Sequence, residues 1–356
     1  SMDRNTAPTN AESSTGGSSV VTVTGDNFGS DPSRLVVRLL SNPASVAASE
    51  ELNHDFTAAE VTLVDDTMLT FVVPQGSGAV KLLEIAVSDQ STTDSMSVPL
   101  GGSAWPSDNA DLSVHSGQPW APLVFRYNDP VLTSTSGDVG TRGGVLILFG
   151  RNFGRFMDDS GNCLASSATV TLSTTLGFEA VSLVCDLAPF CASQTHERLQ
   201  CLVPPGVGAD YDILLRQSSR SDLLPREFSY LPPVLEDVSP TPARADVAFE
   251  ITLTGQNFGN AGRSNVTVYI GGRLCEEARI EETDTTTLDV IKCRSQPQTV
   301  GPKSLNISVA FQQVFFAATD GWVELNCPEN QYGQVGEVCQ ACPPGGSCSV
   351  HADPTE

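Results

Sequence analysis

Short runs in which apolar and polar residues alternate cover most of the chain, and no long stretch has apolar residues at helical spacing. Val21 and Val23 alternate with Thr22 and Thr24, which is typical of a strand with one buried face. Further short apolar runs, ended by turn residues, span 35–40, 61–64, 68–73, 80–87 and 123–127. Strands this short with Gly and Pro between them predict a β-sandwich.

A Gly-x-Asn-Phe-Gly motif follows an apolar run three times. Its members are Gly25, Asn27, Phe28 and Gly29; Gly150, Asn152, Phe153 and Gly154; and Gly255, Asn257, Phe258 and Gly259. The copies are 125 (152 − 27) and 105 (257 − 152) residues apart, so a domain-sized unit repeats. We interpret the motif as a structural corner: the first Gly ends the strand at positive φ, Asn adopts a left-handed conformation and bonds nearby backbone, Phe fills the space beneath, and the last Gly redirects the chain.

Two other signatures repeat with the corner. Leu69–Pro74 matches Leu199–Pro204, and 290–297 is a looser copy in which Cys293, like Cys201, takes the position of Phe71. A disulfide or a bulky apolar group could therefore fill the same core site. The stretch F-R-Y-N-D-P at 125–130 returns as F-S-Y-L-P-P at 228–233. Such short, Pro-stiffened linkers predict a rod.

The repeats predict an all-β fold: three tandem immunoglobulin-like β-sandwiches and a small disulfide-rich C-terminal module. We place the units at 1–127, 128–231 and 232–318, and the module at 319–356. The region near 88–121 is interpreted as an insertion in the first unit, with one strand around 95–100. Trp105 and Trp120, inside the insertion, fit buried side chains better than a sugar-stacking surface.

The net charge of the chain argues against some classes of partner. Lys and Arg number 19 against 42 Asp and Glu, a net charge of −23, which argues against nucleic-acid and anionic-lipid partners. No apolar run is long enough to span a membrane. Ser1 and Met2 resemble a cloning remnant, and we expect the chain to be a fragment of a longer protein.

The ten cysteines fall into even groups, and none precedes Cys163. The groups are Cys163, Cys185, Cys191 and Cys201; Cys275 and Cys293; and Cys327, Cys339, Cys342 and Cys348. This segregation predicts disulfides closed within each unit and an oxidising compartment. Zinc in the last group is the weaker alternative, because it has one Cys-x-x-Cys pair and no supporting His.

The spacing suggests some pairings. Cys275 has only Cys293 as a partner within its unit. By position Cys201 corresponds to Cys293 and Cys185 to Cys275, which leaves Cys163 with Cys191, although four cysteines allow three pairings. Asn265 and Asn306 each begin an Asn-x-Ser/Thr sequon and are candidate glycosylation sites in a secreted chain.

One strand breaks the alternation. Ile147 and Phe149 align with Thr22 and Thr24 and with Thr252 and Thr254, positions expected to face solvent. We therefore expect this face of the second unit to be covered, by the insertion, by a neighbouring unit or by a partner, with intramolecular cover favoured.

No catalytic or cofactor site is indicated. The four histidines, His54, His115, His196 and His351, sit in expected loops or the tail, without a nucleophile in a known motif. The acid pairs at 65–66, 158–159 and 281–282 could bind calcium but lack EF-hand spacing, so solvated loop acids are favoured. We expect a chain that is not an enzyme and has no cofactor.

At the corners, the Pro-x-Gly-x-Gly turns, the Ile-Gly-Gly-x-x-Cys stretch at 270–275 and the F-x-Y-x-x-P junctions, the chain resembles the IPT/TIG family of immunoglobulin-like domains. The tail, with C-P-x-x-x-Y-G and C-x-x-C-P-P-G, resembles cysteine-rich modules of the GCC2/GCC3 or ephrin-receptor type. The acidic charge and clustered cysteines do not fit the family's transcription-factor branch.

The resemblance implies a large, membrane-anchored cell-surface glycoprotein, such as one of a cilium or gamete. Its anchor would lie outside this fragment. Two function classes remain: a stiff extracellular rod for adhesion or protein recognition, and a carbohydrate-binding or accessory module of a secreted protein.

Overall fold

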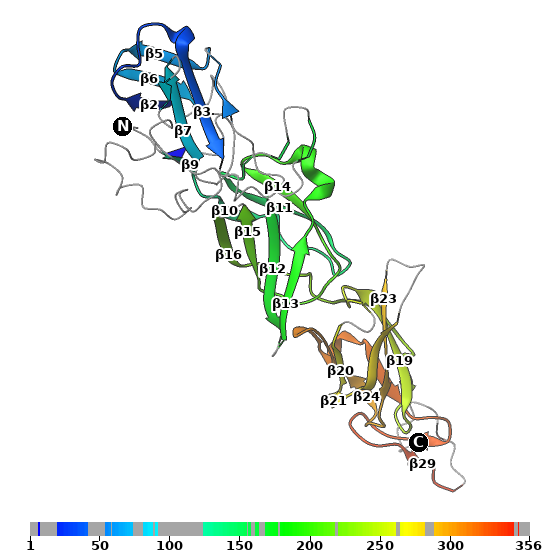
Figure 1. The fold of residues 1–356 in the computed structure, drawn as a ribbon. Helices are drawn as coiled ribbons and strands as arrows, with labels where there is room; N and C mark the ends of the chain where they lie inside the picture. Colours follow the sequence, from blue (N-terminus) through cyan, green and yellow to red (C-terminus); the bar gives the residue numbers. More distant parts are fainter. Residues whose placement is uncertain are drawn as a thin grey trace.

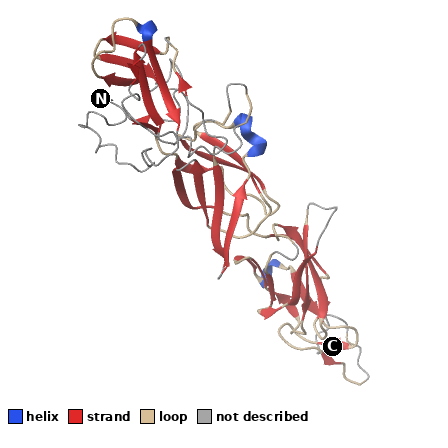
Figure 2. Ribbon diagram, viewed as in Figure 1, coloured by secondary structure: helices blue, strands red, loops and turns tan. Residues whose placement is uncertain are grey.

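The computed structural model describes residues 6–7, 20–41, 54–57, 59–73, 81–87, 90–91, 124–154, 156–157, 161–163, 168–176, 179–217, 220–260, 264–281, 288–344 and 348. More than half of these residues lie in β-strands, as the alternating pattern predicts (Figure 2). Helix occurs in the described part only as short 3₁₀ turns: η1 (Pro32–Arg34), η3 (Ala188–Ser193) and η4 (Ala318–Asp320). The all-β fold class is confirmed.

Two sheets enclose the first hydrophobic core. One has the order β2-β6-β5, and the other β1-β9-β7-β3-β4 with β8 paired to β7. The strands are β1 (Thr6–Ala7), β2 (Val20–Thr24), β3 (Leu35–Ser41), β4 (His54–Asp55), β5 (Val61–Asp65), β6 (Met68–Val72), β7 (Lys81–Val87), β8 (Gln90–Ser91) and β9 (Val124–Tyr127). The longer strands coincide closely with the predicted ones, whereas the two-residue strands β1, β4 and β8 were not predicted, and His54, expected in a loop, lies in β4. The strand expected around 95–100 lies outside the described residues.

Two further sheets enclose the second core, with the orders β10-β11-β14 and β13-β12-β15-β16. The strands are β10 (Val131–Thr135), β11 (Gly144–Arg151), β12 (Thr169–Leu176), β13 (Glu179–Cys185), β14 (Arg198–Val203), β15 (Tyr211–Gln217) and β16 (Arg220–Phe228). Tyr211, Phe228 and Tyr230 meet edge to face at one end of this core, with ring centroids 5.2–5.8 Å apart.

The third core lies among the sheets β17-β19-β23-β22, β21-β20-β25-β26 and β18-β27-β24. The strands are β17 (Val234–Ser239), β18 (Ala243–Arg244), β19 (Phe249–Gln256), β20 (Val266–Ile270), β21 (Arg273–Leu274), β22 (Glu276–Glu281), β23 (Asp289–Ser295), β24 (Gly301–Lys303), β25 (Leu305–Val309), β26 (Gln312–Phe316) and β27 (Val323–Asn326). A small hairpin follows, β28 (Gln331–Tyr332) with β29 (Gln340–Ala341).

The third core extends past residue 318, where the sequence analysis placed a boundary. Val323, Leu325 and Cys327 are buried in it, and β27 pairs with β18 and β24. Cys339 packs against the same core, so the beginning of the tail is docked onto the third unit.

The repeat is visible in the strand register. Phe71 lies opposite Val21, Cys201 opposite Leu146, and Cys293 opposite Ile251, and each of these six side chains is buried. In the first unit, where no disulfide crosses the core, Phe71 packs on Phe56 with ring centroids 4.6 Å apart. One core position is thus filled either by sulfur or by an aromatic ring.

The three sets of sheets follow one another along an elongated molecule, with the two termini toward opposite ends (Figure 1). Each core is a separate cluster of buried side chains. The corners of the second and third units contact the linkers that precede those units.

Candidate recognition face and the corners that support it

The corners share one backbone conformation. Asn27, Asn152 and Asn257 have φ of 66°, 61° and 61°, and the last glycines of the motif, Gly29, Gly154 and Gly259, have φ of 80°, 78° and 87°. Asn tolerates the left-handed region better than other residues with a Cβ. Phe28, Phe153 and Phe258 are buried beneath the turns, as expected.

The first glycine of the motif has a different role from the one expected. Gly25, Gly150 and Gly255 are not among the positive-φ residues. A Cβ at Gly150 would lie 2.0 Å from the carbonyl oxygen of Val131 and 2.5 Å from the Phe153 ring, and Gly255 is confined in the same way by Val234 and Phe258. Close approach of a neighbouring strand and of the motif's own ring therefore requires this glycine. β11 and β19 also continue one residue beyond it.

The corner asparagines bind the linkers that join the units. The Nδ2 of Asn152 donates to the carbonyl oxygen of Asp129 (2.9 Å), and the Nδ2 of Asn257 donates to that of Pro232 (3.2 Å). Each acceptor immediately precedes a proline in the junction sequence. Proline fixes φ, and the asparagine holds the preceding carbonyl, so the direction of the linker is restricted on both sides.

Contacts across the junction between the second and third units add to this restriction. Arg142 Nη2 lies 2.8 Å from Asp289 Oδ1, while Asp289 Oδ2 accepts from the backbone N–H of Phe258 at 2.9 Å. Gln312 Nε2 donates to the carbonyl oxygen of Tyr230 (2.7 Å). Asp289 is buried, so its ion pair is shielded from solvent on one side.

Apolar packing continues across the same junction. Val207 and Leu176, from the second unit, pack against the third core. A Cβ at Gly259 would lie 2.6 Å from Val207 Cγ1, so the last glycine of this corner is needed for contact between units as well as for its φ.

All ten cysteines are paired, each within its own group. The pairs are Cys163–Cys191, Cys185–Cys201, Cys275–Cys293, Cys327–Cys339 and Cys342–Cys348. The first three are the pairs that the spacing suggested. The last two give the disulfide pairing of the tail, which the sequence left open. Complete pairing of this kind is typical of chains from oxidising compartments, and the immunoglobulin-like fold is of the extracellular type.

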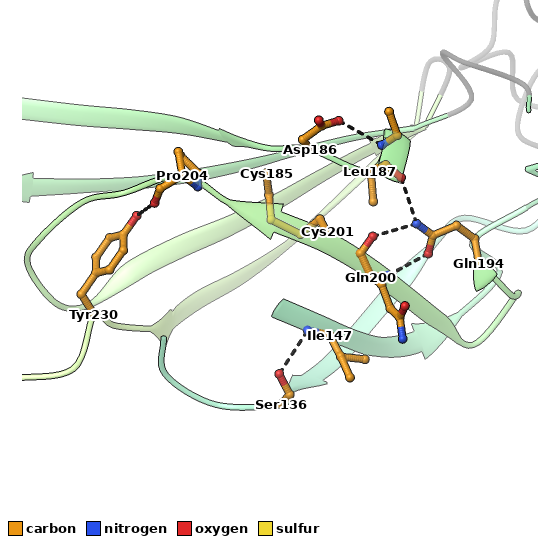
Figure 3. Close-up of a disulfide and its surroundings, with 11 residues drawn as sticks. Ser136, Ile147, Cys185, Asp186, Leu187, Gln194, Gln200, Cys201, Pro204 and Tyr230 are labelled. Carbon is orange, nitrogen blue, oxygen red and sulfur yellow. Dashed lines mark hydrogen bonds between the residues drawn. A yellow bond between two sulfur atoms is a disulfide. The ribbon is translucent and has the colours of Figure 1, made fainter. Parts of the chain in front are cut away.

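The outward side of β10-β11-β14 carries an apolar surface, which we call the recognition face: Val145, Ile147, Phe149 and Leu202. Val145 is 47% exposed, Phe149 38% and Leu202 42%, and Ile147 is half-buried. Val145 pairs directly with Leu202 across the strands, and Ile147 with Gln200. Figure 3 shows Ile147 and Gln200 extending to one side of the sheet, while Cys185 and Cys201 join on the other.

The expected cover over Ile147 and Phe149 is not provided by the described part of the chain, since Phe149 keeps more than a third of its surface exposed. The insertion near 88–121, the favoured cover, lies outside the described residues. As far as the described residues go, the recognition face is an uncovered apolar surface next to Arg198, which pairs with Phe149 across the strands.

Equivalent positions in the other units are more polar. In the third unit Thr252 pairs with Lys292 and Glu250 with Arg294. In the first unit Thr22 pairs with Thr70, although Val20 and Val72 at the strand ends are exposed. Sequence reasoning found Ile147 and Phe149 but missed Val145 and Leu202, whose membership depends on the pairing register and could have been inferred by aligning both strands.

His196 and the acid pair at 65–66, which the sequence analysis considered as candidates, are part of the folded framework. Burial lowers the pKa of His196 to about 4, so this side chain is neutral near pH 7. The Asp65 carboxylate accepts from Thr67, and Asp66 Oδ1 accepts from the backbone N–H of Gly29 at 2.7 Å. These acids therefore hold turns, and no group of three potential metal ligands occurs among the described residues.

Of the other two acid pairs, one lies outside the described residues and one lies partly outside them. Residues 158–159 are not described, and Glu281 is ion-paired with Arg279 at 2.8 Å while its neighbour at 282 is not described. Within the described chain, no helix is long and apolar enough to cross a membrane.

In a comparison with known protein families, one family model matches part of the chain. Residues 233–320, which hold most of the third unit, match the model of the IPT/TIG domain. No curated protein matches the chain.

Solved structures that match the chain include a crystal structure with a xylogluco-oligosaccharide, at 14% identity and TM-score 0.33, covering 89% of this chain and 58% of that one. Another is the surface glycan-binding protein PbSGBP-B of Prevotella bryantii, at 14% identity and TM-score 0.28, covering 53% and 41%. The plexin A4 extracellular region matches at 12% identity and TM-score 0.23, covering 91% and 33%. Likenesses this distant carry no argument about function, and the chain spans little more than half of the first structure's length.

Proposed function

We propose that the chain is a non-enzymatic, extracellular segment of a larger cell-surface protein, in which three IPT/TIG-like units and a cysteine-rich module form a stiff rod for adhesion or protein recognition. The proposed units are 1–127, 128–231 and a third that begins at 232 and extends beyond 318. The parent protein would be anchored in a membrane outside this segment, on a cilium, a gamete or another cell surface.

The recognition face carries this proposal. Solvent-facing positions of a sandwich strand are ordinarily polar, yet Val145, Ile147 and Phe149 are consecutive outward residues of β11, and Leu202 extends the surface onto β14. Contiguous exposed apolar residues with a polar rim often mark interaction sites. The rim here includes Arg151 and Arg198, which would suit a protein partner with an apolar centre and acidic edges.

A protein partner is favoured over a free carbohydrate at this face. Sugar-binding surfaces use flat aromatic side chains with converging polar groups, whereas this face has one aromatic ring among aliphatic side chains. Trp105 and Trp120, which could supply an aromatic platform, lie outside the described residues. The carbohydrate-binding alternative therefore predicts glycan binding that is independent of Phe149.

Phe149→Asp in the full chain tests the proposal. A fluorescent multimer of the native chain should bind cells of its source organism, and the variant should bind about tenfold or more weakly, because the only aromatic side chain of the apolar contact is replaced by a charged one. Thr254→Asp is the matched control, since it occupies the equivalent position of the third unit and should bind within about twofold of the native chain.

The proposal is rejected if Phe149→Asp binds as well as the native chain, or if Thr254→Asp loses as much. Thermal unfolding of both variants shows whether a loss reflects folding. Binding of the Phe149 variant to a glycan array at native strength would favour the carbohydrate alternative.

A further inference from the structure

An exposed aromatic pair flanks the sequon at Asn306. In the sheet β21-β20-β25-β26, Tyr269 of β20 lies directly opposite Asn306 of β25, which in turn lies opposite Phe315 of β26. Directly opposite residues of an antiparallel pair point to the same face with Cβ atoms roughly 4.5–5.5 Å apart. Tyr269, Asn306 and Phe315 therefore form one outward row.

The two rings are unusually exposed for the middle of a sandwich face. Phe315 is 66% exposed and Tyr269 40%, while the intervening Asn306 is half-buried. Their exposed apolar surface faces solvent on both sides of an asparagine that begins an Asn-x-Ser sequence. Exposed aromatic surface in such an arrangement calls for a covering group.

The asparagine itself is incompletely satisfied. Its Oδ1 is buried and has no hydrogen-bond partner, which is costly for an amide oxygen. A sugar bonded to Nδ2 would bring hydroxyl and acetamido donors next to this oxygen. It would also place its apolar ring face against the neighbouring aromatic rings.

We propose that the row Tyr269–Asn306–Phe315 is a seat for an N-linked glycan carried by Asn306, whose first sugar packs on the two rings. The reaction forms a bond between Nδ2 and C1 of the sugar and breaks the bond from C1 to the oxygen of a lipid diphosphate donor. The Nδ2 proton leaves with the released diphosphate. Because β25 is hydrogen-bonded to strands on both sides, this transfer precedes closure of the sheet.

The second sequon provides an internal control. Asn265 is exposed immediately before β20, and its backbone oxygen accepts from the N–H of Ala310. Thr267 and Ser308, the hydroxyl residues of the two sequons, pair directly across β20 and β25, so both sequons belong to one face. No strand register places Asn265 between two aromatic rings, so a glycan there should not depend on Tyr269 or Phe315.

The experiment uses the full chain secreted from a eukaryotic host, a route that the proposed function requires. Peptide mass spectrometry measures occupancy at Asn265 and Asn306. Thermal unfolding then compares Asn306→Gln in the native background and in a Tyr269→Ser/Phe315→Ser background. Loss of the Asn306 glycan should lower the midpoint by roughly 4 °C or more in the native background, the scale of one favourable aromatic contact. Without the two rings the same loss should lower the midpoint by clearly less.

Asn265→Gln should shift the midpoint equally in both backgrounds. The inference is overturned if Asn306 is unoccupied, or if its glycan stabilises the chain equally with and without the two rings. Occupancy at Asn265 alone would overturn it while leaving the extracellular proposal intact. If neither site is occupied, the inference also fails, and cell binding through Phe149 decides the proposed function separately.

Discussion

At the scale of single residues, the corner asparagine combines two tasks that no other residue performs equally well. Asn152 adopts φ of 61°, and its side chain holds the carbonyl oxygen of Asp129 in the linker. Alanine can do neither without cost, whereas glycine can adopt the φ but cannot make the bond. The two substitutions therefore separate backbone conformation from linker binding.

We predict that Asn152→Ala lowers the free energy of unfolding of the second unit by about 2 kcal/mol, from left-handed strain and a lost hydrogen bond. Asn152→Gly should lose about 1 kcal/mol, because only the bond is removed. Denaturant unfolding of the full chain, followed by a probe in the second unit, measures both. Equal losses would show that the left-handed conformation contributes nothing.

At the scale of elements, the equivalent positions of Phe71, Cys201 and Cys293 show that the sandwich needs a filled core site rather than a particular chemistry. One of the two disulfides of the second unit, Cys185–Cys201, joins β13 to β14 and thus one sheet to the other. Its two sulfur atoms lie inside the core, where both cysteines are buried. Removing it opens a chain loop and leaves a space.

We predict that Cys185→Ala/Cys201→Ala lowers the unfolding free energy of the second unit by about 3 kcal/mol, the value for a closed loop of about 15 residues. Equilibrium unfolding of the purified double variant gives this difference. Removing Cys163–Cys191 is the comparison: Cys163 is exposed, so that variant should keep the core intact. A Cys185/Cys201 variant as stable as the native chain would contradict a structural role for this bridge.

Much of the fold was predictable because its signals are local. Alternation located the strands, and the paired positions of Cys185 and Cys201 followed from comparing repeats. The role of Gly150 was missed because it depends on the carbonyl of Val131 on an adjacent strand, which no local pattern encodes. No local pattern predicts the ion pair between Arg142 and Asp289 either, because these residues are 147 positions apart and come together only where two units meet.

Part of the candidate site was also predictable. Ile147 and Phe149 were visible as a break in alternation relative to the matching Thr residues of the other repeats. Leu202 was not predicted, because it follows Cys201, which belongs to the inner face. Only the pairing of Leu202 with Val145 places Leu202 on the outer face. The aromatic row around Asn306 likewise required the pairing of three strands.

At the scale of the whole molecule, our central claim is that the second and third units are held at a fixed angle, so that the recognition face is presented from a stiff support. The contacts responsible are Arg142 with Asp289, Gln312 with Tyr230, and Asn257 with Pro232. Arg142 can be removed without breaking the bond from Asp289 to the corner N–H of Phe258. Its loss should therefore loosen the junction without unfolding either unit.

The most direct test is the distribution of distances between spin labels at two exposed positions, Ser182 on β13 and Thr319 in η4, attached through noncanonical residues so that all five disulfides are preserved. We predict one narrow distribution for the native chain and a broad one for Arg142→Ala/Gln312→Ala, with unchanged unfolding midpoints of the two units. A broad distribution in the native chain would contradict a fixed angle. A narrow one in the double variant would contradict the claim that Arg142 and Gln312 hold that angle.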